Sequence, residues 1–361
     1  MKKTSKTMAL LLAFALLSTQ LVFAAPMPVD IIAGTGSPGS ENGMTATFHM
    51  PHDIILLPSG EIIVADTYSN LLRRIDINGL TENFAGISGV GTHVDGELSL
   101  ARLNRPSSLA IGSGGNIFIA DSANNSIRVI VGGMLYTFAG GGESGFADGP
   151  AGYARFANPS AIAFGVGGYL YVADTQNHVI RRINQDGYAT TFAGVPGQSG
   201  YANGAANNAL FDSPAGVAVA ADGRVFVADT GNHVIRVIEN GNVRTFAGQA
   251  AEEEGGILDG LAAEALFNQP RGLDLWDGSL IIADSANHRI RMVSPDGFVT
   301  SIMYADLHFP MGVHVFGDIL YIADTGNNMI RAMELVAQVE YPPEPIPIPE
   351  PAHDQTPAST F

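Results

Sequence analysis

Histidine and carboxylate side chains gather around prolines that open repeated segments of this chain. Four of the nine histidines lie within four residues of such a proline: His49, His52, His308 and His314. Two carboxylates, Asp53 and Asp274, fall at similar positions. Because several histidines with a carboxylate are typical ligands of a divalent metal, the pattern predicts a metal site. The spacing matches no short metal motif, and the alternative is a set of unrelated histidines bonded to water or backbone.

A second set of residues marks where the repeated segments differ from one another, just after their opening prolines. These candidate binding residues are His52, Asp53, Arg271, Asp274 and Met311. Function is expected where copies differ, because identical positions in every copy serve the repeat itself. No Gly-x-Ser-x-Gly, His-Glu-x-x-His or phosphate-binding loop is present, and the chain has no cysteine to act as a nucleophile or zinc ligand. These residues leave the question of an enzyme open.

An aspartate followed seven residues later by an arginine occurs in all six copies. The aspartates are Asp66, Asp121, Asp174, Asp229, Asp284 and Asp324. The arginines are Arg73, Arg128, Arg181, Arg236, Arg291 and Arg331. An active site needs asymmetry, which six identical pairs do not supply, so the pattern predicts a structural role. The carboxylate can accept N–H bonds from a turn, and a guanidinium among apolar strand residues needs a fixed carboxylate partner.

The repeats themselves predict the fold. Each copy starts at a proline and contains four short runs of β-branched and aromatic residues, bounded by Gly, Asn and Asp. Four short antiparallel strands, repeated roughly every 40–55 residues, are typical of propeller blades. The sixth copy has only three strands, over about 312–333, and residues 30–34 resemble the missing fourth. We predict an all-β, six-bladed β-propeller of four-stranded antiparallel blades whose last blade is closed by the N-terminal strand.

One segment carries a family resemblance. Ala-Asp-Thr-Gly-Asn-His-Val-Ile-Arg-Val-Ile at 228–238 resembles the NHL repeat, which is named for an Asn-His-Leu signature. The resemblance covers about residues 28–335 and implies a six-bladed propeller, in a family of scaffolds, sensors and a few enzymes. Those enzymes include a zinc-dependent lyase of peptide amidation, and related propellers include lactonases that use calcium or zinc. The resemblance therefore implies Zn²⁺ or Ca²⁺ as the ion, although only the histidine cluster and Arg271 match the lyase centre.

The two ends of the chain differ from its middle. Residues 1–24 combine lysines, an apolar run and small residues, which is typical of a secretory signal peptide. Residues 25–337 are expected to form the propeller, and residues 338–361 a flexible proline-rich tail. We expect a secreted bacterial protein, extracellular or associated with the cell wall, because an exported chain without cysteine suits a bacterium better than a eukaryote.

The net charge of the chain excludes some classes of binding partner. The formal net charge of −17 argues against nucleic acid, and no run after the signal peptide is long enough to span a membrane. We expect a monomer that binds a protein, peptide or glycan at the cell surface, or serves as a scaffold there. The alternative is a metal-dependent lyase or hydrolase, resembling the amidating lyase or the lactonases, with its site at the mouth of the central channel. A third hypothesis is the sensor part of an envelope signalling system.

Overall fold

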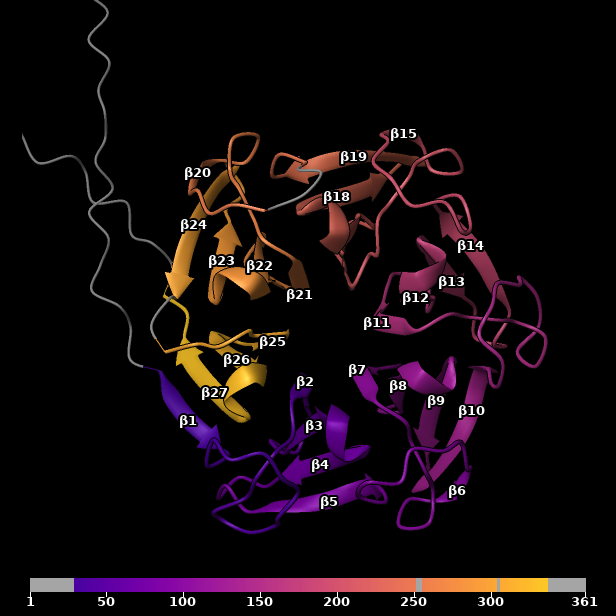
Figure 1. The fold of residues 1–361 in the computed structure, drawn as a ribbon, viewed down its shortest axis with the longest axis vertical. Helices are drawn as coiled ribbons and strands as arrows, with labels where there is room; N and C mark the ends of the chain where they lie inside the picture. The colour runs from indigo at the N-terminus through magenta and orange to yellow at the C-terminus, as the bar shows by residue number, and fades with distance from the viewer. Residues whose placement is uncertain (1–28, 251–254, 304–305, 337–361) are drawn as a thin grey trace, which may run out of the picture.

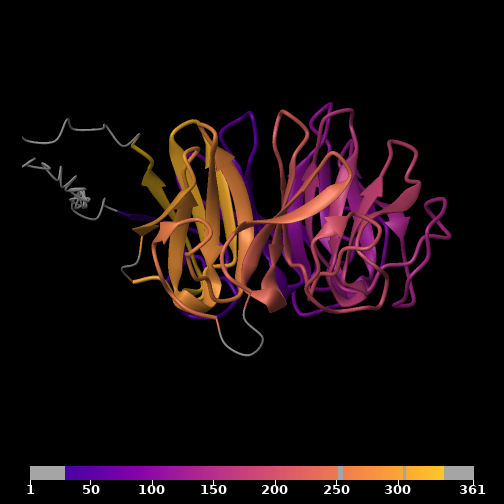
Figure 2. The ribbon, with the colours of Figure 1, turned by 90° about the horizontal axis from the view of Figure 1, so that it is seen from above.

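Six antiparallel sheets surround a central axis in the computed structural model of this chain, and each sheet is one blade (Figure 1). The structure describes residues 29–250, 255–303 and 306–336. Seen from the side, the ring is broader than it is thick (Figure 2). The predicted all-β, six-bladed propeller is confirmed. The predicted signal peptide (1–24) and tail (338–361) lie outside the described residues.

Four strands recur in each blade, from the axis outward. The innermost strands are β2 (Pro51–Leu56), β7 (Pro106–Ile111), β11 (Pro159–Phe164), β16 (Gly216–Val219), β21 (Pro270–Trp276) and β25 (Gly312–Phe316). The second strands are β3 (Ile62–Asp66), β8 (Ile117–Asp121), β12 (Leu170–Asp174), β17 (Val225–Asp229), β22 (Ser279–Asp284) and β26 (Ile319–Asp324). The third strands are β4 (Leu71–Ile75), β9 (Ser126–Val131), β13 (Val179–Ile183), β18 (Val234–Glu239), β23 (Arg289–Val293) and β27 (Met329–Glu334). The fourth strands are β5 (Thr81–Gly86), β10 (Met134–Gly140), β14 (Ala189–Ala193), β19 (Asn242–Ala247), β24 (Phe298–Met303) and β1 (Asp30–Ala33).

A single turn of 3-10 helix joins the second strand of each blade to the third. These turns are η1 (Thr67–Ser69), η2 (Ser122–Asn124), η3 (Thr175–Asn177), η4 (Thr230–Asn232), η5 (Ser285–Asn287) and η6 (Thr325–Asn327). Each turn ends at an Asn or His in the left-handed conformation. Asn tolerates this conformation better than most residues do, and His is also enriched there, so the signature pair of the repeat forms the chain reversal.

Three blades carry a fifth strand, which differs from the predicted four. The extra strands are β6 (Gly96–Glu97), β15 (Gly204–Ala205) and β20 (Gly260–Leu261). Each pairs with the fourth strand of its blade and lies in the loop that leads into that blade. The repeat pattern did not reveal them because two residues are too few to show an alternation.

The N-terminal strand closes the ring. β1 pairs antiparallel with β27 and completes the sheet β1-β27-β26-β25. The glycine after β1 has the conformation of the glycine that ends β5. Gly34 has φ +100° and Gly86 has φ +96°, and at both a Cβ atom would lie 2.6 Å from the carbonyl oxygen of the facing turn. The predicted closure is therefore confirmed.

The hydrophobic core lies between neighbouring blades. Six apolar clusters each combine side chains of two adjacent sheets, including one between the last blade and the first. Each innermost strand contacts the innermost strands of both neighbours, so the six strands surround the axis. Within the described part of the chain, no helix has the length and apolar character that crossing a membrane requires.

Candidate ligand-binding site at the central channel

The six repeated aspartates and arginines meet inside the blades, away from the axis. In the first five blades, Nη1 of each arginine lies 2.6–3.1 Å from Oδ2 of its aspartate, and both side chains are fully buried. In the sixth, Nε of Arg331 lies 2.6 Å from Oδ2 of Asp324. The other oxygen of each aspartate accepts the N–H of the residue two before the opening proline. Each pair therefore joins the second and third strands to the entry of the first.

A second acceptor for the five fully buried arginines comes from the loops between blades. Arg128 binds Asp95, Arg181 binds Asp148 at 2.8 Å, and Arg291 binds Asp259 at 2.6 Å. Arg73 and Arg236 differ because their loop partners are neutral amide oxygens, of Asn42 at 2.9 Å and of Asn203 at 2.8 Å. Sequence reasoning missed this role, although an Asp-Gly or Asn-Gly turn sits 31–33 residues before each of these arginines.

Hydroxyl groups join each blade to the next around the whole ring. The Thr or Ser after each repeated aspartate donates to the carbonyl oxygen of the proline that opens the following blade. The oxygen–oxygen distances are 2.6–2.8 Å, and Thr325 of the last blade bonds Pro51 of the first. The repeated Thr or Ser thus fixes where each innermost strand begins, and so positions the mouth of the channel.

The Asn or His at the end of each 3-10 turn also accepts a bond from the next blade. Nδ1 of His178, His233 and His288 accepts a backbone N–H of the following blade at 2.9–3.1 Å. Asn Oδ1 takes the same part at the other three junctions. Both side chains offer an acceptor at the same place, which explains why the repeat tolerates either.

The histidine junctions predict a dependence of stability on pH. Burial lowers the pKa of His233, against the opposing charge of Asp212. A lowered pKa favours neutral His in the folded state, so its contribution is complete above the unfolded pKa of about 6.5 and is lost below it. We expect His233→Asn to leave stability at pH 7.5 nearly unchanged and to reduce the loss between pH 7.5 and 5 by about 1 kcal/mol. Urea unfolding at both pH values measures this; an identical loss in both proteins would contradict it.

The central channel is a cavity of about 340 Å³ lined by all six innermost strands. His52, Asp53, Asp274, Met311 and His314 line it. Arg271 lies next to the lining residue Gly272 at the start of β21, and so stands at the mouth. Four of the five candidate binding residues therefore line the channel, and the charge of the fifth, Arg271, acts on His52. Of the four candidate metal ligands, His52 and His314 line it.

The channel has one polar side and one side of small residues. At the first position after the proline, blades five, six and one carry Arg271, Met311 and His52, whereas blades two to four carry Ser107, Ser160 and Ala215. Three residues further along, Asp274 and His314 of blades five and six face alanines of blades two to four. The groups capable of chemistry are thus concentrated on the junction of blades five, six and one.

The two carboxylates of the channel hold neighbouring strands together. Asp53 accepts the N–H groups of Ile54 and Leu109 at 2.8 Å, and joins blades one and two. Asp274 accepts the N–H groups of Leu275 and Val315 at 2.8 and 2.7 Å, and joins blades five and six. Burial raises the pKa of Asp53 to about 6, although the two N–H bonds, Ser108 and His314 oppose the rise. Asp274 also lies 3.3 Å from Nδ1 of His314.

Cationic and aromatic groups surround the mouth. Burial lowers the pKa of His52 to about 3, with further lowering by the charges of Arg271 and Arg105, so this imidazole is neutral. The guanidinium of Arg105 lies 4.9 Å from the ring centre of Tyr68, and the His52 ring lies 6.3 Å from the same ring. Burial alone lowers the pKa of Arg271. The mouth therefore carries positive charge on a protein whose net charge is negative.

The other two candidate metal ligands do not line the channel. His308 stacks on His288 at 5.0 Å between ring centres, and the His49 ring lies 5.4 Å from Tyr68. Both occupy the position whose N–H bonds the repeated aspartate, which keeps them beside the turn. In residues 29–250, 255–303 and 306–336, no three His, Asp or Glu side chains are placed to share a metal ion. The four histidines thus do not fit a common Zn²⁺ or Ca²⁺ site.

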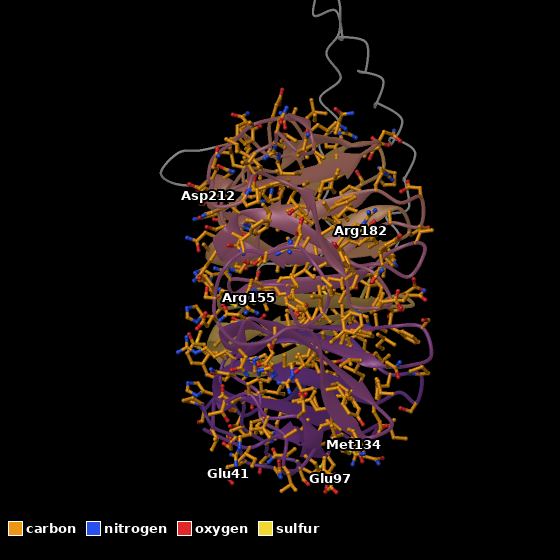
Figure 3. The ribbon with its side chains drawn as sticks, turned by 90° about the vertical axis from the view of Figure 1, so that its right-hand side faces the viewer. Glu41, Glu97, Met134, Arg155, Arg182 and Asp212 are labelled. Atoms are coloured by element: carbon orange, nitrogen blue, oxygen red, sulfur yellow. The ribbon has the colours of Figure 1, made fainter. Side chains whose placement is uncertain are left out.

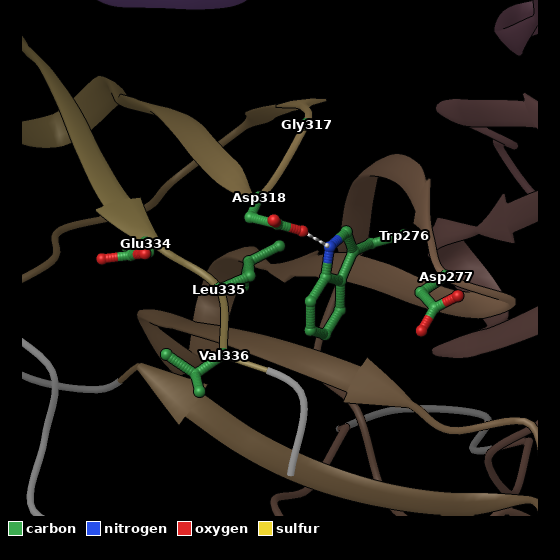
Figure 4. Close-up of a pocket in the computed structure, with 7 residues that line it drawn as sticks. All are labelled: Trp276, Asp277, Gly317, Asp318, Glu334, Leu335 and Val336. Atoms are coloured by element: carbon green, nitrogen blue, oxygen red, sulfur yellow. Dashed lines mark hydrogen bonds between the residues drawn. The ribbon is translucent and has the colours of Figure 1, made fainter.

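A second hollow, of about 520 Å³, lies at the far ends of the strands in blades five and six (Figure 4). Trp276 lines it and donates its indole N–H to Asp318 at 3.1 Å. Because β21 starts at the channel mouth and ends at Trp276, the hollow opens on the opposite face. Figure 3 shows the two faces from the side, with Asp212 on the mouth side and Met134 toward the other. The repeat analysis did not single out this tryptophan, because it lies at the end of β21, where the six copies differ in sequence.

A closed ring of six four- or five-stranded blades defines a β-propeller. Comparison with known sequences identifies the type of repeat that forms the blades. The family model described as "NHL repeat" matches residues 103–130, 211–238 and 267–291. The chain therefore carries NHL repeats in these three segments of a six-bladed propeller. It is similar to "NHL repeat-containing protein 2" of Bos taurus, with 27% identity over 330 residues, which cover 77% of this chain and 45% of that protein. The chain spans less than half the length of the first curated relatives it matches.

Solved structures share the fold at low identity. Virginiamycin B lyase from Staphylococcus aureus, in a catalytically inactive form with quinupristin, superposes with a TM-score of 0.54 and 15% identity, covering 86% of this chain and 100% of that one. An auxiliary nutrient binding protein from Bacteroides thetaiotaomicron superposes with a TM-score of 0.62 and 13% identity, covering 84% and 75%. One neighbour is an enzyme and the other a binding protein, so the fold alone does not choose between these functions.

Proposed function

We propose that this protein is a binding or scaffold module that holds a protein, peptide or glycan ligand at the mouth of its central channel. One observation carries the proposal. Nε2 of His52 and Nε2 of His314, both on innermost strands, are buried without a hydrogen-bond partner in the described chain. Beside them, Arg271 of β21 has an unpaired Nε like the structural arginines, but unlike them it also lacks any Nη partner among the described residues. Buried polar groups are rarely left unpaired. A ligand at the mouth would supply the missing partners.

A screen of ligands against unfolding temperature tests this proposal. Peptides, glycans and cell-wall fragments that bind the folded protein should raise its Tm. We expect the shift to disappear in the double variant His52→Ala/Arg271→Ala and to persist in Arg244→Ala, which changes an exposed ion pair of blade four. Shifts in Tm that persist in the double variant would show that the ligand binds elsewhere on the protein. If no ligand shifts the Tm, the proposal is contradicted.

The proposal also includes where the protein acts relative to the cell. The pattern of residues 1–24 supports export, with the propeller acting outside the cell or at its surface. Cell fractionation of the producing organism, with an antibody against the propeller, measures this directly. Recovery of the full-length chain in the cytosol would contradict it.

A second candidate function is a lyase or hydrolase in the same channel, favoured by the pairing of Asp274 with His314. Oδ2 of Asp274 lies 3.3 Å from Nδ1 of His314, and Nε2 of this histidine is buried without a partner on the polar side of the channel, which resembles the arrangement of a general base. The histidines do not fit a common metal site, so no step is assigned to a metal. Turnover of lactone or ester probes that is lost in His314→Gln would support this function, and metal analysis of the purified protein would show whether an ion is bound.

A further inference from the structure

Arg271 differs from the structural arginines because it has no acidic partner. Arg73, Arg128, Arg181, Arg236 and Arg291 are buried, and each binds the aspartate of its own blade. Arg271 is half-buried and forms no hydrogen bond or ion pair with any of the described residues, whereas the Nη atoms of the structural arginines are all bonded. Partial burial of a charge without a counter-ion is unfavourable. Among the described residues, Arg271 is therefore a cation without a partner.

No neighbouring group of the chain supplies that partner. The nearby titratable group is His52, which is neutral because burial, and then the charge of Arg271, lower its pKa to about 3. The channel carboxylates Asp53 and Asp274 each accept two backbone N–H bonds that join adjacent blades, so neither is free to turn toward the mouth. Arg105 adds a second cation at the rim, beside Tyr68. The mouth is thus a positive site that an anion from outside would complete.

The number of cations indicates which anion fits. Because Arg105 already lies over the Tyr68 ring, Arg271 is the one guanidinium at the mouth without a contact partner among the described residues. One guanidinium balances one negative charge, which matches a carboxylate, whereas a phosphate group carries about −1.5 to −2 at pH 7. The planar fork of arginine also fits the two oxygens of a carboxylate. A polyanion such as an acidic polysaccharide would be repelled by a chain with a net charge of −17.

We propose that the channel mouth recognises a carboxylate group of a peptide, with Arg271 as its binding partner. This inference rests on the proposed binding function. Met311, from the neighbouring blade, is close to Arg271, since its carbonyl oxygen accepts the N–H of Gly272 at 2.9 Å. A flexible methionine suits contact with a peptide chain. The small residues of blades two to four leave room for the peptide opposite the arginine.

Four probes test the inference by NMR of the arginine Nε–H and histidine ring signals of the full-length protein. They are acetyl-Ala-Ala-Glu-amide, acetyl-Ala-Ala-Ala with a free terminal carboxylate, acetyl-Ala-Ala-Gln-amide and inorganic phosphate. We expect saturable shifts of Arg271 and His52 with a carboxylate peptide, and binding at least tenfold weaker for the glutamine peptide and for phosphate. The first two probes separate a side-chain carboxylate from a chain terminus.

Two variants complete the test. Arg271→Gln should abolish the shifts of His52, and Arg182→Gln, whose guanidinium stacks on Tyr169 at 4.5 Å, should preserve them. Equal binding of the glutamine peptide at the mouth would overturn the carboxylate inference and leave the binding function standing. Phosphate binding as tight as that of the peptides would also overturn it. If none of these probes and no ligand of the wider screen perturbs His52 or Arg271, both the inference and the proposed function fail.

Discussion

Replacing Asp229 with alanine is expected to lower the free energy of unfolding by about 3–5 kcal/mol, the usual effect of removing one partner from a buried ion pair. Asp229 receives three hydrogen bonds, from Arg236 at 2.7 Å, from Asn232 at 2.9 Å and from the N–H of Asp212 at 2.7 Å. Its loss leaves Arg236 buried with only the neutral Asn203 and two backbone carbonyl oxygens as acceptors. Urea unfolding followed by circular dichroism measures the change.

Blade three provides the matched control for this substitution. Asp174→Ala removes the same carboxylate, but Arg181 keeps a charged partner in Asp148, 2.8 Å from its Nη2 atom. We expect a loss smaller than that of Asp229→Ala by about 1–2 kcal/mol. Asn203→Asp gives blade four the same second carboxylate and should reduce the effect of Asp229→Ala. Equal losses in the two blades would show that the loop carboxylate does not stabilise the arginine.

The propeller could be predicted from the sequence because its evidence is local and repeated. The Asp, the Arg seven residues later and the opening proline recur in order, and the strand pattern lies between them. Even ring closure was visible, since residues 30–34 resemble the end of the other fourth strands. A feature that occurs six times can be recognised without knowledge of what it contacts.

Contacts between repeats were harder to predict. Asp148 and Arg181 are 33 residues apart and meet only because the loop folds back over its own blade. Thr230 repeats as plainly as Asp229, yet its acceptor is Pro270 of the next blade. The sequence shows that such residues recur, but the partner depends on how the blades pack.

The channel illustrates the same limit for function. The first and fourth residues after each proline are predicted at the channel mouth because the innermost strands begin there, and His52 and His314 do line the channel. The position two before the proline is predicted at the same mouth, but a left-handed residue separates it from the strand. Met50 and Phe309 have φ values of 50° and 49°, and this reversal leaves His49 and His308 beside the turns.

The contrast between Arg271 and Arg236 gives the second large prediction, in which the same change has opposite signs. Arg236→Met should destabilise the protein by about 3–5 kcal/mol, because Asp229 would lose its cation. Arg271→Met should instead stabilise the protein by about 1–2 kcal/mol, because no acidic partner is lost and a partly desolvated charge is removed. Urea unfolding of both variants at pH 7.5 measures the two effects.

A stabilising substitution that also removes peptide binding would identify Arg271 as a residue kept for function at the expense of stability. The reason is physical: a group that serves the fold finds its partner within the fold, as Arg236 does in Asp229. A group that serves a ligand stays without a partner until the ligand arrives. If Arg271→Met destabilises the protein as much as Arg236→Met does, the guanidinium has a structural partner within the chain, and the channel mouth loses its main support as a binding site.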